Sequence, residues 1–434
     1  MKEYFTLDDF KNNLEDKYVA VRIDLNSDIV DGKLIPNERF ERHSKTIKEL
    51  AEKKAKIILL AHQSRKGEPD FISLEQHAKI LSEYVGIEIK FVNDIIGERA
   101  ENEIKKLKPG EVLLLDNVRF LEDEDVEKSF EEHAKSSLVE FLSKFIDYYV
   151  LDAFSVAHRA HASVVGFAYG GGKGIPLIAG RVLEDEIRNL ENFLSSKEIV
   201  FLVGGAKVDD VISVLKYIFE KSSERVKYVI CGGVVANLFL KVSRYEIGSG
   251  SEEILRKIVK NNEEKLKELE SAAKWIYEKY KEKIILPKDF LVKINGDKIE
   301  CKIGEVPKNA TILDIGFETI KYYKNMIKEL YNNGWILIKG PMGKFEEKGF
   351  ENGTKEILSY IAELTKAGKI KSLVGGGDTS VAMEKLGIDK NDFTYVSTGG
   401  GALITYLSGK PMLGLEALKI NYRYLTTKKE KERG

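Results

Sequence analysis

The first half of the chain alternates short apolar runs with longer stretches in which apolar residues recur at helical spacing. The spaced stretches predict helices at 41–53, 74–84 and 130–144. The apolar runs predict β-strands at 19–23, 56–61, 88–92, 112–115 and 148–151. Strands and helices that alternate at this rhythm are typical of βαβ units around a parallel sheet. We therefore expect an α/β domain in this half.

The second half resumes the alternation but adds glycine turns. After a breaker-rich stretch at 169–176, residues 180–193 have the spacing of a helix suited to joining two domains. Five glycine turns then follow apolar β-type runs, at 204–207, 232–233, 340–343, 375–379 and 399–401. Glycine lets the backbone approach a ligand closely, and the N-terminus of a following helix favours anions. These turns predict a second α/β domain that binds a nucleotide.

The first half instead places polar and basic residues just beyond the ends of its predicted strands. Ligands bind at this carboxyl edge in open α/β sheets. The residues are Asp24, Asn26, His62, Arg65, Arg119, His158, Arg159 and His161, with Arg39 in the loop after the first strand. The guanidinium fork suits carboxylate and phosphate oxygens, so the set predicts a site for a phosphorylated acid. Pairing with local acids such as Glu122 explains any one arginine as well, but not four at equivalent strand ends.

Two charged residues follow glycine turns of the second half. Lys207 is expected to open a helix, where its ammonium group would reach a phosphate. Asp378 follows three glycines and is expected to hold a Mg²⁺ ion that bridges phosphates, with a plain helix N-cap as the alternative. The sequence contains neither the Walker A pattern nor the dinucleotide-binding fingerprint, which excludes those two common nucleotide sites.

Composition narrows the class of protein further. The 434 residues suffice for two or three domains, and a net charge of -1 gives no sign of a nucleic-acid partner. Cys231 and Cys301 are the only cysteines, which excludes a disulfide framework. The sequence shows no signal peptide and no apolar run long enough to span a bilayer, so we expect a cytoplasmic protein.

Taken in order, these segments resemble phosphoglycerate kinase, in its archaeal form. The resemblance runs along nearly the whole chain, through residues 21–26, 61–65, 116–120, 152–161, 204–207, 340–346, 375–379 and 397–402. The run His62-Gln63-Ser64-Arg65 is the archaeal feature, because other branches of the family usually read His-Leu-Gly-Arg there.

The resemblance implies an α/β fold of two Rossmann-like domains with mainly parallel sheets, hinged around a central cleft. Residues 1–180 would form an N-terminal domain that binds 3-phosphoglycerate, with 419–434 packing back on it, and 181–418 a C-terminal domain that binds Mg-nucleotide. The implied activity is reversible phosphoryl transfer between ATP and the carboxylate of 3-phosphoglycerate, giving 1,3-bisphosphoglycerate and ADP, in glycolysis and gluconeogenesis. Mg²⁺ carried by the nucleotide is the implied cofactor. No nucleic acid or membrane is expected, and the protein would be a monomer or a homodimer whose hinge closes during turnover.

The implied site residues stand at positions that match the family. The substrate-binding set is Asp24, Leu25, Asn26, Arg39, His62, Gln63, Ser64, Arg65, Arg119 and Arg159. The nucleotide-binding set is Gly205, Ala206, Lys207, Glu346 at the ribose, Gly375, Gly376, Gly377, Thr379 and Asp378, which would also hold the metal. Arg39 and Lys207 are the implied catalytic residues, with Arg39 closest to the transferred group. A carboxylate acceptor is already an anion at neutral pH, so the reaction needs alignment and positive charge rather than a general base.

Two positions depart from the family pattern. Val211 stands where a second lysine is usual, and Lys339 where an asparagine is usual. We hypothesise that Lys339 supplies part of the missing positive charge; a surface lysine near a strand end is the competing interpretation.

Two other functions stay open at this stage. A kinase for a different small acid would need fewer arginines, so the full set favours a phosphorylated acid. A catalytically silent nucleotide-binding regulator or scaffold is disfavoured because Arg39, Lys207 and Asp378 are all present.

Overall fold

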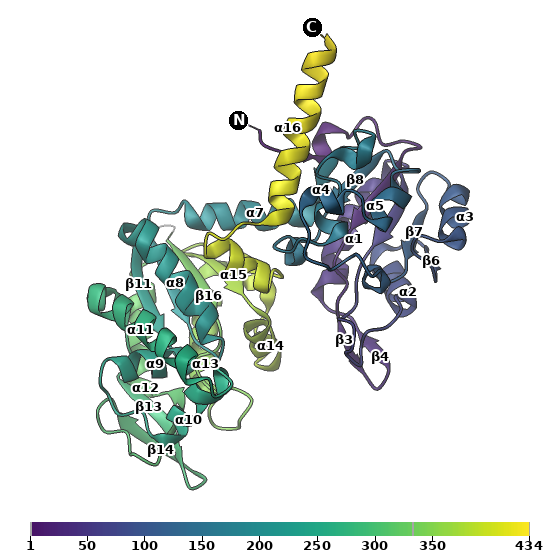
Figure 1. The fold of residues 1–434 in the computed structure, drawn as a ribbon. Helices are drawn as coiled ribbons and strands as arrows, with labels where there is room; N and C mark the ends of the chain where they lie inside the picture. The colour runs from purple at the N-terminus through teal and green to yellow at the C-terminus, as the bar shows by residue number, and fades with distance from the viewer. Residues whose placement is uncertain (1, 332–333, 434) are drawn as a thin grey trace. The chain divides into compact units, whose positions relative to one another are not determined.

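The computed structural model describes residues 2–331 and 334–433, which form two compact units (Figure 1). Unit 1 comprises the residues up to 188 together with those from 411 onward, and unit 2 comprises residues 189–410. The boundary falls within helix α7 (Arg181–Leu194), which covers the stretch predicted to join two domains. Met1 and Gly434, the ends of the predicted domain ranges, lie outside the described residues.

The described part of unit 1 is built on a seven-stranded sheet in which every recorded pairing is parallel. The strand order is β1 (Phe5–Thr6), β9 (Leu177–Ala179), β8 (Tyr148–Leu151), β2 (Tyr18–Arg22), β5 (Lys56–Leu60), β7 (Val112–Leu115) and β6 (Ile89–Val92). All five strands predicted from apolar runs are present, with ends displaced by at most one residue. They could be predicted because strands covered by helices on both faces are apolar on both faces.

Unit 1 differs from the prediction in its helices. Its main helices are α1 (Glu38–Glu52), α2 (Glu75–Val85), α3 (Glu98–Lys106), α4 (Phe130–His133), α5 (Ser137–Leu142) and α6 (Ala162–Val165). The single helix predicted at 130–144 is wrong: Asp123 accepts hydrogen bonds from the backbone and hydroxyl groups of Ser137 at 2.7 and 2.8 Å, and a new helix begins there. A two-stranded hairpin, β3 (Asp28–Val30) and β4 (Lys33–Ile35), follows the β2 loop.

The last helix, α16 (Leu413–Arg433), belongs to unit 1 although unit 2 precedes it in the chain. The fully buried Asn421 donates to the carbonyl oxygens of Phe167 and Ile175 at 2.9 and 3.1 Å and accepts from the Leu177 amide at 2.8 Å. Because Leu177 opens β9, this amide side chain joins the C-terminal helix to the sheet of unit 1.

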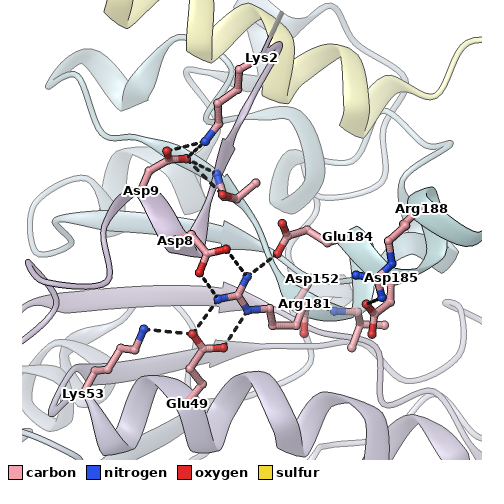
Figure 2. A network of polar contacts seen from close by, with 12 residues as sticks. Lys2, Asp8, Asp9, Glu49, Lys53, Asp152, Arg181, Glu184, Asp185 and Arg188 are labelled. Atoms are coloured by element: carbon pink, nitrogen blue, oxygen red, sulfur yellow. Dashed lines mark hydrogen bonds and ion pairs between the residues drawn. The ribbon is translucent and has the colours of Figure 1, made fainter. Parts of the chain in front are cut away.

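The start of α7 is fixed to unit 1 by a network of ion pairs (Figure 2). The Arg181 guanidinium makes two hydrogen bonds of 2.8 Å to Glu49 of α1, and it also pairs with Asp8 at 2.9 Å and Glu184 at 3.0 Å. The Asp152 carboxylate accepts from the Val182 amide at 2.8 Å. The first turn of α7 is therefore held by three separate segments of unit 1.

The described residues of unit 2 contain a six-stranded parallel sheet and a separate three-stranded antiparallel sheet. The parallel order is β12 (Ile284–Ile285), β11 (Val226–Cys231), β10 (Ile199–Val203), β16 (Trp335–Lys339), β17 (Lys371–Gly375) and β18 (Tyr395–Ser397). The antiparallel order is β14 (Asp297–Lys302), β13 (Asp289–Ile294) and β15 (Thr311–Ile315). The second sheet was not predicted from the sequence, because β14 is largely exposed and carries no apolar run.

Helices connect the strands of unit 2, and several begin at the glycine turns. They are α8 (Val208–Ser222), α9 (Gly233–Val242), α10 (Ser249–Ile258), α11 (Glu263–Lys279), α12 (Phe317–Lys328), α13 (Asn352–Lys366), α14 (Gly377–Lys385) and α15 (Gly401–Leu407). The predicted α/β architecture with mainly parallel sheets is confirmed in both units. Within the described ranges, no helix is long and apolar enough to cross a bilayer.

Candidate active site

The loop after β2 is organised around Asp24, whose side chain is almost fully buried. Asp24 Oδ1 accepts from the Asn26 amide at 2.9 Å, and Oδ2 accepts from the Ser155 hydroxyl and lies 3.1 Å from Arg39 Nε. Burial raises the pKa of the Asp24 carboxyl, but the Arg39 guanidinium and these hydrogen bonds outweigh it, and the pKa lies below its ordinary value. Asp24 is therefore a carboxylate at neutral pH.

Arg39 is the second residue of α1, so its expected place in the preceding loop is wrong. Asn37 caps this helix by accepting from the Arg39 amide at 3.1 Å, and its side chain donates to the Asn26 carbonyl oxygen at 3.0 Å. The Arg39 guanidinium donates to the same carbonyl oxygen and pairs with Asp24. Arg39 is thus held in place while 26% of its side chain stays exposed.

The loop after β5 carries His62, Gln63, Ser64 and Arg65 and is tied to the β2 loop. Ser64 has a positive φ of 56°, and its amide donates to Asn26 Oδ1 at 2.7 Å. The buried Gln63 side chain accepts from the Ser27 amide at 3.0 Å and donates to the Ser27 carbonyl oxygen at 2.8 Å. Leu25 and Gln63 are both fully buried, so both residues serve the fold and neither is exposed to a ligand in this structure.

Three arginines gather beside these loops. Arg119 lies in the 3-10 helix η2 (Val118–Phe120), donates to the Ser64 carbonyl oxygen and is 8% exposed. Burial, together with the Arg22 and Arg159 charges, lowers the pKa of Arg119 to about 10. Burial and the neighbouring Arg65 charge likewise lower the pKa of Arg159. These neighbouring positive charges repel one another. A bound anion would offset the repulsion, so the cluster is suited to binding an anion.

Two supporting residues of this site escaped the sequence analysis. The ring of His43, within α1, accepts from the Asp24 amide through Nε2 at 3.1 Å and lies 2.9 Å from Asp152 through Nδ1. Since Nε2 accepts an N–H group, Nδ1 carries the ring proton and donates it to Asp152. No pattern in the sequence indicates this contact, because a histidine inside an amphipathic helix looks like an ordinary helical residue.

Unit 2 contains a cavity of about 900 Å³. Its lining includes Gly205, Ala206, Lys207, Glu346 and Asp378 of the predicted nucleotide-binding set. Much of the remaining lining is apolar: Val234, Ile254, Ile258, Ile312, Leu313, Pro341 and Phe345. An apolar cavity with a few polar groups suits the flat ring of a nucleotide base.

Lys207 and Asp378 bring two helix N-termini to this cavity. Lys207 is the N-cap residue of α8, Asp378 is the second residue of α14, and their charged groups lie 3.1 Å apart. The N-cap alternative for Asp378 is wrong, because Gly376 holds that position. Both side chains are about half exposed, so this ion pair costs little to exchange for another partner.

The turn at 375–379 supports the cavity without lining it, apart from Asp378. The buried Thr379 hydroxyl accepts from the Gly340 amide at 2.9 Å, which joins two glycine turns. Gly376 has a φ of +100°, and a Cβ there would lie 3.0 Å from Lys339 Nζ. Gly375 ends β17 and is buried.

The glycine turns also pack against one another. The Gly204 amide donates to the Lys339 carbonyl oxygen at 2.8 Å, Gly205 to Pro341 at 2.8 Å, and Gly233 to Met342 at 2.7 Å. A Cβ on Gly204 would lie 2.1 Å from the Pro341 oxygen. Glycine is therefore required there by backbone packing, a reason the sequence analysis did not foresee.

Lys339 ends β16 and is only 8% exposed, so the surface-lysine interpretation is wrong. Its ammonium group lies 3.9 Å from Asp210. Burial and the Lys207 charge lower the pKa of Lys339, while Asp210 and Asp378 act in the opposite direction. Val211, by contrast, lies on the buried face of α8 and is 2% exposed.

Other cavity residues were not among the predicted site residues. Lys293 and Lys344 line the cavity and pair with Glu347 at 2.6 and 2.9 Å. Lys293 was missed because it lies in the antiparallel sheet, which the hydrophobic pattern did not predict. Among the described residues, no group of three His, Cys, Asp or Glu side chains is placed to hold a metal ion.

Comparison with known proteins gives consistent matches along the chain. The family described as phosphoglycerate kinase matches residues 7–410. The phosphoglycerate kinase of Methanopyrus kandleri is 39% identical over 415 residues, which cover 95% of this chain and 97% of that protein. The enzyme of Methanococcus maripaludis is 40% identical over 432 residues, covering 96% and 99%.

Solved structures agree with these relatives. The crystal structure of phosphoglycerate kinase from Pyrococcus horikoshii matches with a TM-score of 0.84 and 35% identity, covering 97% of this chain and 100% of that one. The structure of phosphoglycerate kinase from Coxiella burnetii matches with a TM-score of 0.76 and 31% identity, covering 97% and 99%.

Proposed function

The chain belongs to the phosphoglycerate kinase family, and we propose that unit 1 binds 3-phosphoglycerate while unit 2 binds the Mg-nucleotide. The reaction is the reversible transfer of a phosphoryl group between ATP and the carboxylate of 3-phosphoglycerate, which gives 1,3-bisphosphoglycerate and ADP in glycolysis and gluconeogenesis. The main support for assigning the acid substrate to unit 1 is that Arg65, Arg119 and Arg159 lie close together there.

The arginines and the two tied loops form the proposed acid site. Arg65, Arg119 and Arg159 supply positive charge for the phosphate, and Arg39 faces the carboxylate that accepts the phosphoryl group. Asp24 and the Asn26 carbonyl oxygen hold the Arg39 guanidinium in position. His62 and Ser64 complete the site, and the buried Leu25 and Gln63 support its two loops. Charge-assisted contacts of this kind orient a small anion as well as binding it.

The cavity of unit 2 is the proposed nucleotide site. Its apolar residues hold the base, and Glu346 binds the ribose. Lys207, the turn at Gly205 and Ala206, and the exposed start of α14 at Gly377 and Asp378 bind the phosphates, as helix N-termini favour anions, while the buried Gly375, Gly376 and Thr379 support that turn. Asp378 is suited to Mg²⁺, which typically takes one or two carboxylates and the phosphates of its nucleotide rather than a cage of protein ligands. When bound, the metal neutralises charge on the phosphates.

The reaction requires this chain to supply positive charge and to align the two substrates. The acceptor carboxylate is already ionised, so no residue has to remove a proton. Lys207 can leave Asp378 for a phosphate oxygen at small cost, since their pair is half exposed. We assign Lys339 as a further cation for the phosphates because it is buried beside Lys207 and Asp378. With the substrates assigned to different units, turnover also requires domain closure.

Other expectations remain predictions. A cytoplasmic location, a monomeric or homodimeric state, and the lack of nucleic-acid or membrane partners follow from the sequence analysis and are tested by fractionation and by sedimentation of the purified protein.

Steady-state kinetics with both substrates tests the division between the units. Arg39→Ala is expected to slow turnover by roughly a hundredfold and to leave the KM for ATP unchanged. Lys207→Ala is expected to weaken the binding of ATP instead. Arg188→Ala is the matched control, because Arg188 is 66% exposed and pairs only with Asp185 of its own helix in the recorded contacts. A rise in the KM for ATP in Arg39→Ala, with unchanged turnover, would contradict the assignment.

A further inference from the structure

Arg22, the last residue of β2, is a fully buried arginine beneath the proposed acid site. Its Nε donates to the Ser163 hydroxyl at 2.8 Å, and Nη1 donates to the Ile23 carbonyl oxygen. Its Nη2 lies 3.1 Å from Nδ1 of His62. A guanidinium stays charged in proteins, so its burial requires hydrogen-bond partners of this kind.

A buried acid group lies across Ser163 from this guanidinium. Glu124 is fully buried and accepts from the Ser163 hydroxyl at 2.5 Å and from the Ser163 amide at 2.9 Å. Burial raises the pKa of Glu124 to about 7, against the opposing influence of Arg22 and the Ser163 hydrogen bonds. Ser163 thus bridges Arg22 and Glu124, and the three residues come from β2, α6 and the segment after η2. The guanidinium is fixed from three directions.

This fixed guanidinium dictates where the His62 proton lies. Arginine has no acceptor group, so His62 Nδ1 must accept the hydrogen bond and carries no proton. The neutral ring then holds its proton on Nε2. The charged and titratable groups around the ring are Arg22 of β2, Asp24 of the following loop, Arg119 of η2, and His161 before α6. Burial and then Arg22 hold the pKa of His62 well below its ordinary value, although Asp24 opposes them.

We propose that Arg22 is a positioning residue that locks His62 in the Nε2–H tautomer, so that His62 binds the acid substrate as a neutral donor. The substrate half of this inference rests on the proposed function. Locked in this way, His62 adds no proton-dependent step to substrate binding between pH 5 and 8, and the charge for the anion comes from the arginines. A histidine with an ordinary pKa would change its charge within that range.

The first experiment reads the tautomer without substrate. Nitrogen-15 NMR of the histidine rings distinguishes protonated from unprotonated nitrogens, and the loss of signals in His62→Gln assigns the ring. The full-length protein is expected to show unprotonated Nδ1, protonated Nε2 and no titration from pH 5 to 8. In Arg22→Met/Glu124→Gln, which removes both the guanidinium and the acid group, the ring is expected to titrate or to mix tautomers. His77 is the internal control, because its ring contacts Gln63 instead, and its signals should not change.

The result that overturns the tautomer is a protonated Nδ1 in the unaltered protein, or an unchanged His62 ring in the double variant. If the double variant does not fold, Ser163→Ala loosens Arg22 without removing it, and the same two results decide the question.

The second experiment tests whether His62 binds the acid substrate as a neutral donor. The KM for 3-phosphoglycerate in the double variant is expected to rise about tenfold at pH 8 and to recover towards pH 6, where His62 becomes charged. A KM in His62→Gln equal to that of the unaltered protein overturns the contact with substrate. Because the NMR result does not depend on substrate, the two halves fail separately.

Discussion

Asp24→Asn offers a direct test of the buried ion pair that holds Arg39. The change removes a negative charge 3.1 Å from Arg39 Nε and keeps the size of the side chain. Removing one partner of a buried ion pair costs about 3–5 kcal/mol, because the other charge is left unpaired. Arg39 keeps 26% of its side chain exposed, so water replaces part of the lost contact. We therefore expect a loss of about 2 kcal/mol in the free energy of unfolding of unit 1.

The pH dependence of this loss has a definite sign. The pKa of Asp24 is lower in the folded protein than in the unfolded chain, where it is near 3.8. A lowered pKa stabilises the folded state above the unfolded value, and the stabilisation disappears as the pH falls through the folded value. The difference between the two proteins should be constant from pH 5 to 8 and should shrink only in strong acid.

Urea denaturation can separate the two units. Trp275 and Trp335 are the only tryptophans of the sequence and both lie in unit 2, so their fluorescence follows that unit, whereas far-UV circular dichroism follows both. Asp24→Asn is expected to shift the part of the dichroism change that fluorescence does not report. Glu15→Gln is the control: its pair with Lys54 is exposed at both ends and should contribute little. If Asp24→Asn matches the unaltered protein within about 0.5 kcal/mol at pH 7, the reasoning is wrong.

Three further substitutions test other parts of the structure. Lys339→Asn is expected to lower turnover about tenfold through the loss of a charged phosphate contact, and an unchanged turnover number would remove Lys339 from the site. Gly233→Ala places a Cβ 2.6 Å from the Gly205 nitrogen at a φ of +50°, so about 1–3 kcal/mol of stability and much of the affinity for ATP should be lost in nucleotide titrations. Arg181→Ala removes the two-bond contact with Glu49 shown in Figure 2 and should lower the melting temperature less at high salt than at low salt; a salt-independent loss would speak against an ionic origin.

Most strands of the two parallel sheets could be predicted because burial on two faces leaves a mainly apolar run; the short strands β1, β9 and β12 were not predicted. The predicted bounds of β7 and β8 agree with the structure at both ends. Helix α3 could not be predicted in the same way, since only Ala100 and Ile104 of its residues are buried and the rest of it is polar. The antiparallel sheet was missed for the related reason that β14 is mostly exposed.

The site residues that follow strands of the sheet could be predicted from the order of elements. The residues that are positioned by packing inside the protein could not. Arg65, Arg119 and Arg159 follow strands of a parallel sheet, so their gathering follows from the order of elements. Arg22 and Glu124 lie inside the protein, yet nothing local distinguishes a buried charge with partners from an exposed one. Their roles depend on contacts between residues about 40 to 140 positions apart in the chain.

The return of α16 to unit 1 has a consequence for how the protein is made. Residues Ala417, Leu418 and Asn421 are fully buried in unit 1, yet the ribosome adds them after all of unit 2. Unit 1 therefore leaves the ribosome without α16, the helix that contacts β9 and α6, whereas residues 189–410 emerge as one uninterrupted block. Nascent unit 2 can thus reach its native structure first, and the earlier-made unit must wait for the end of translation to be completed.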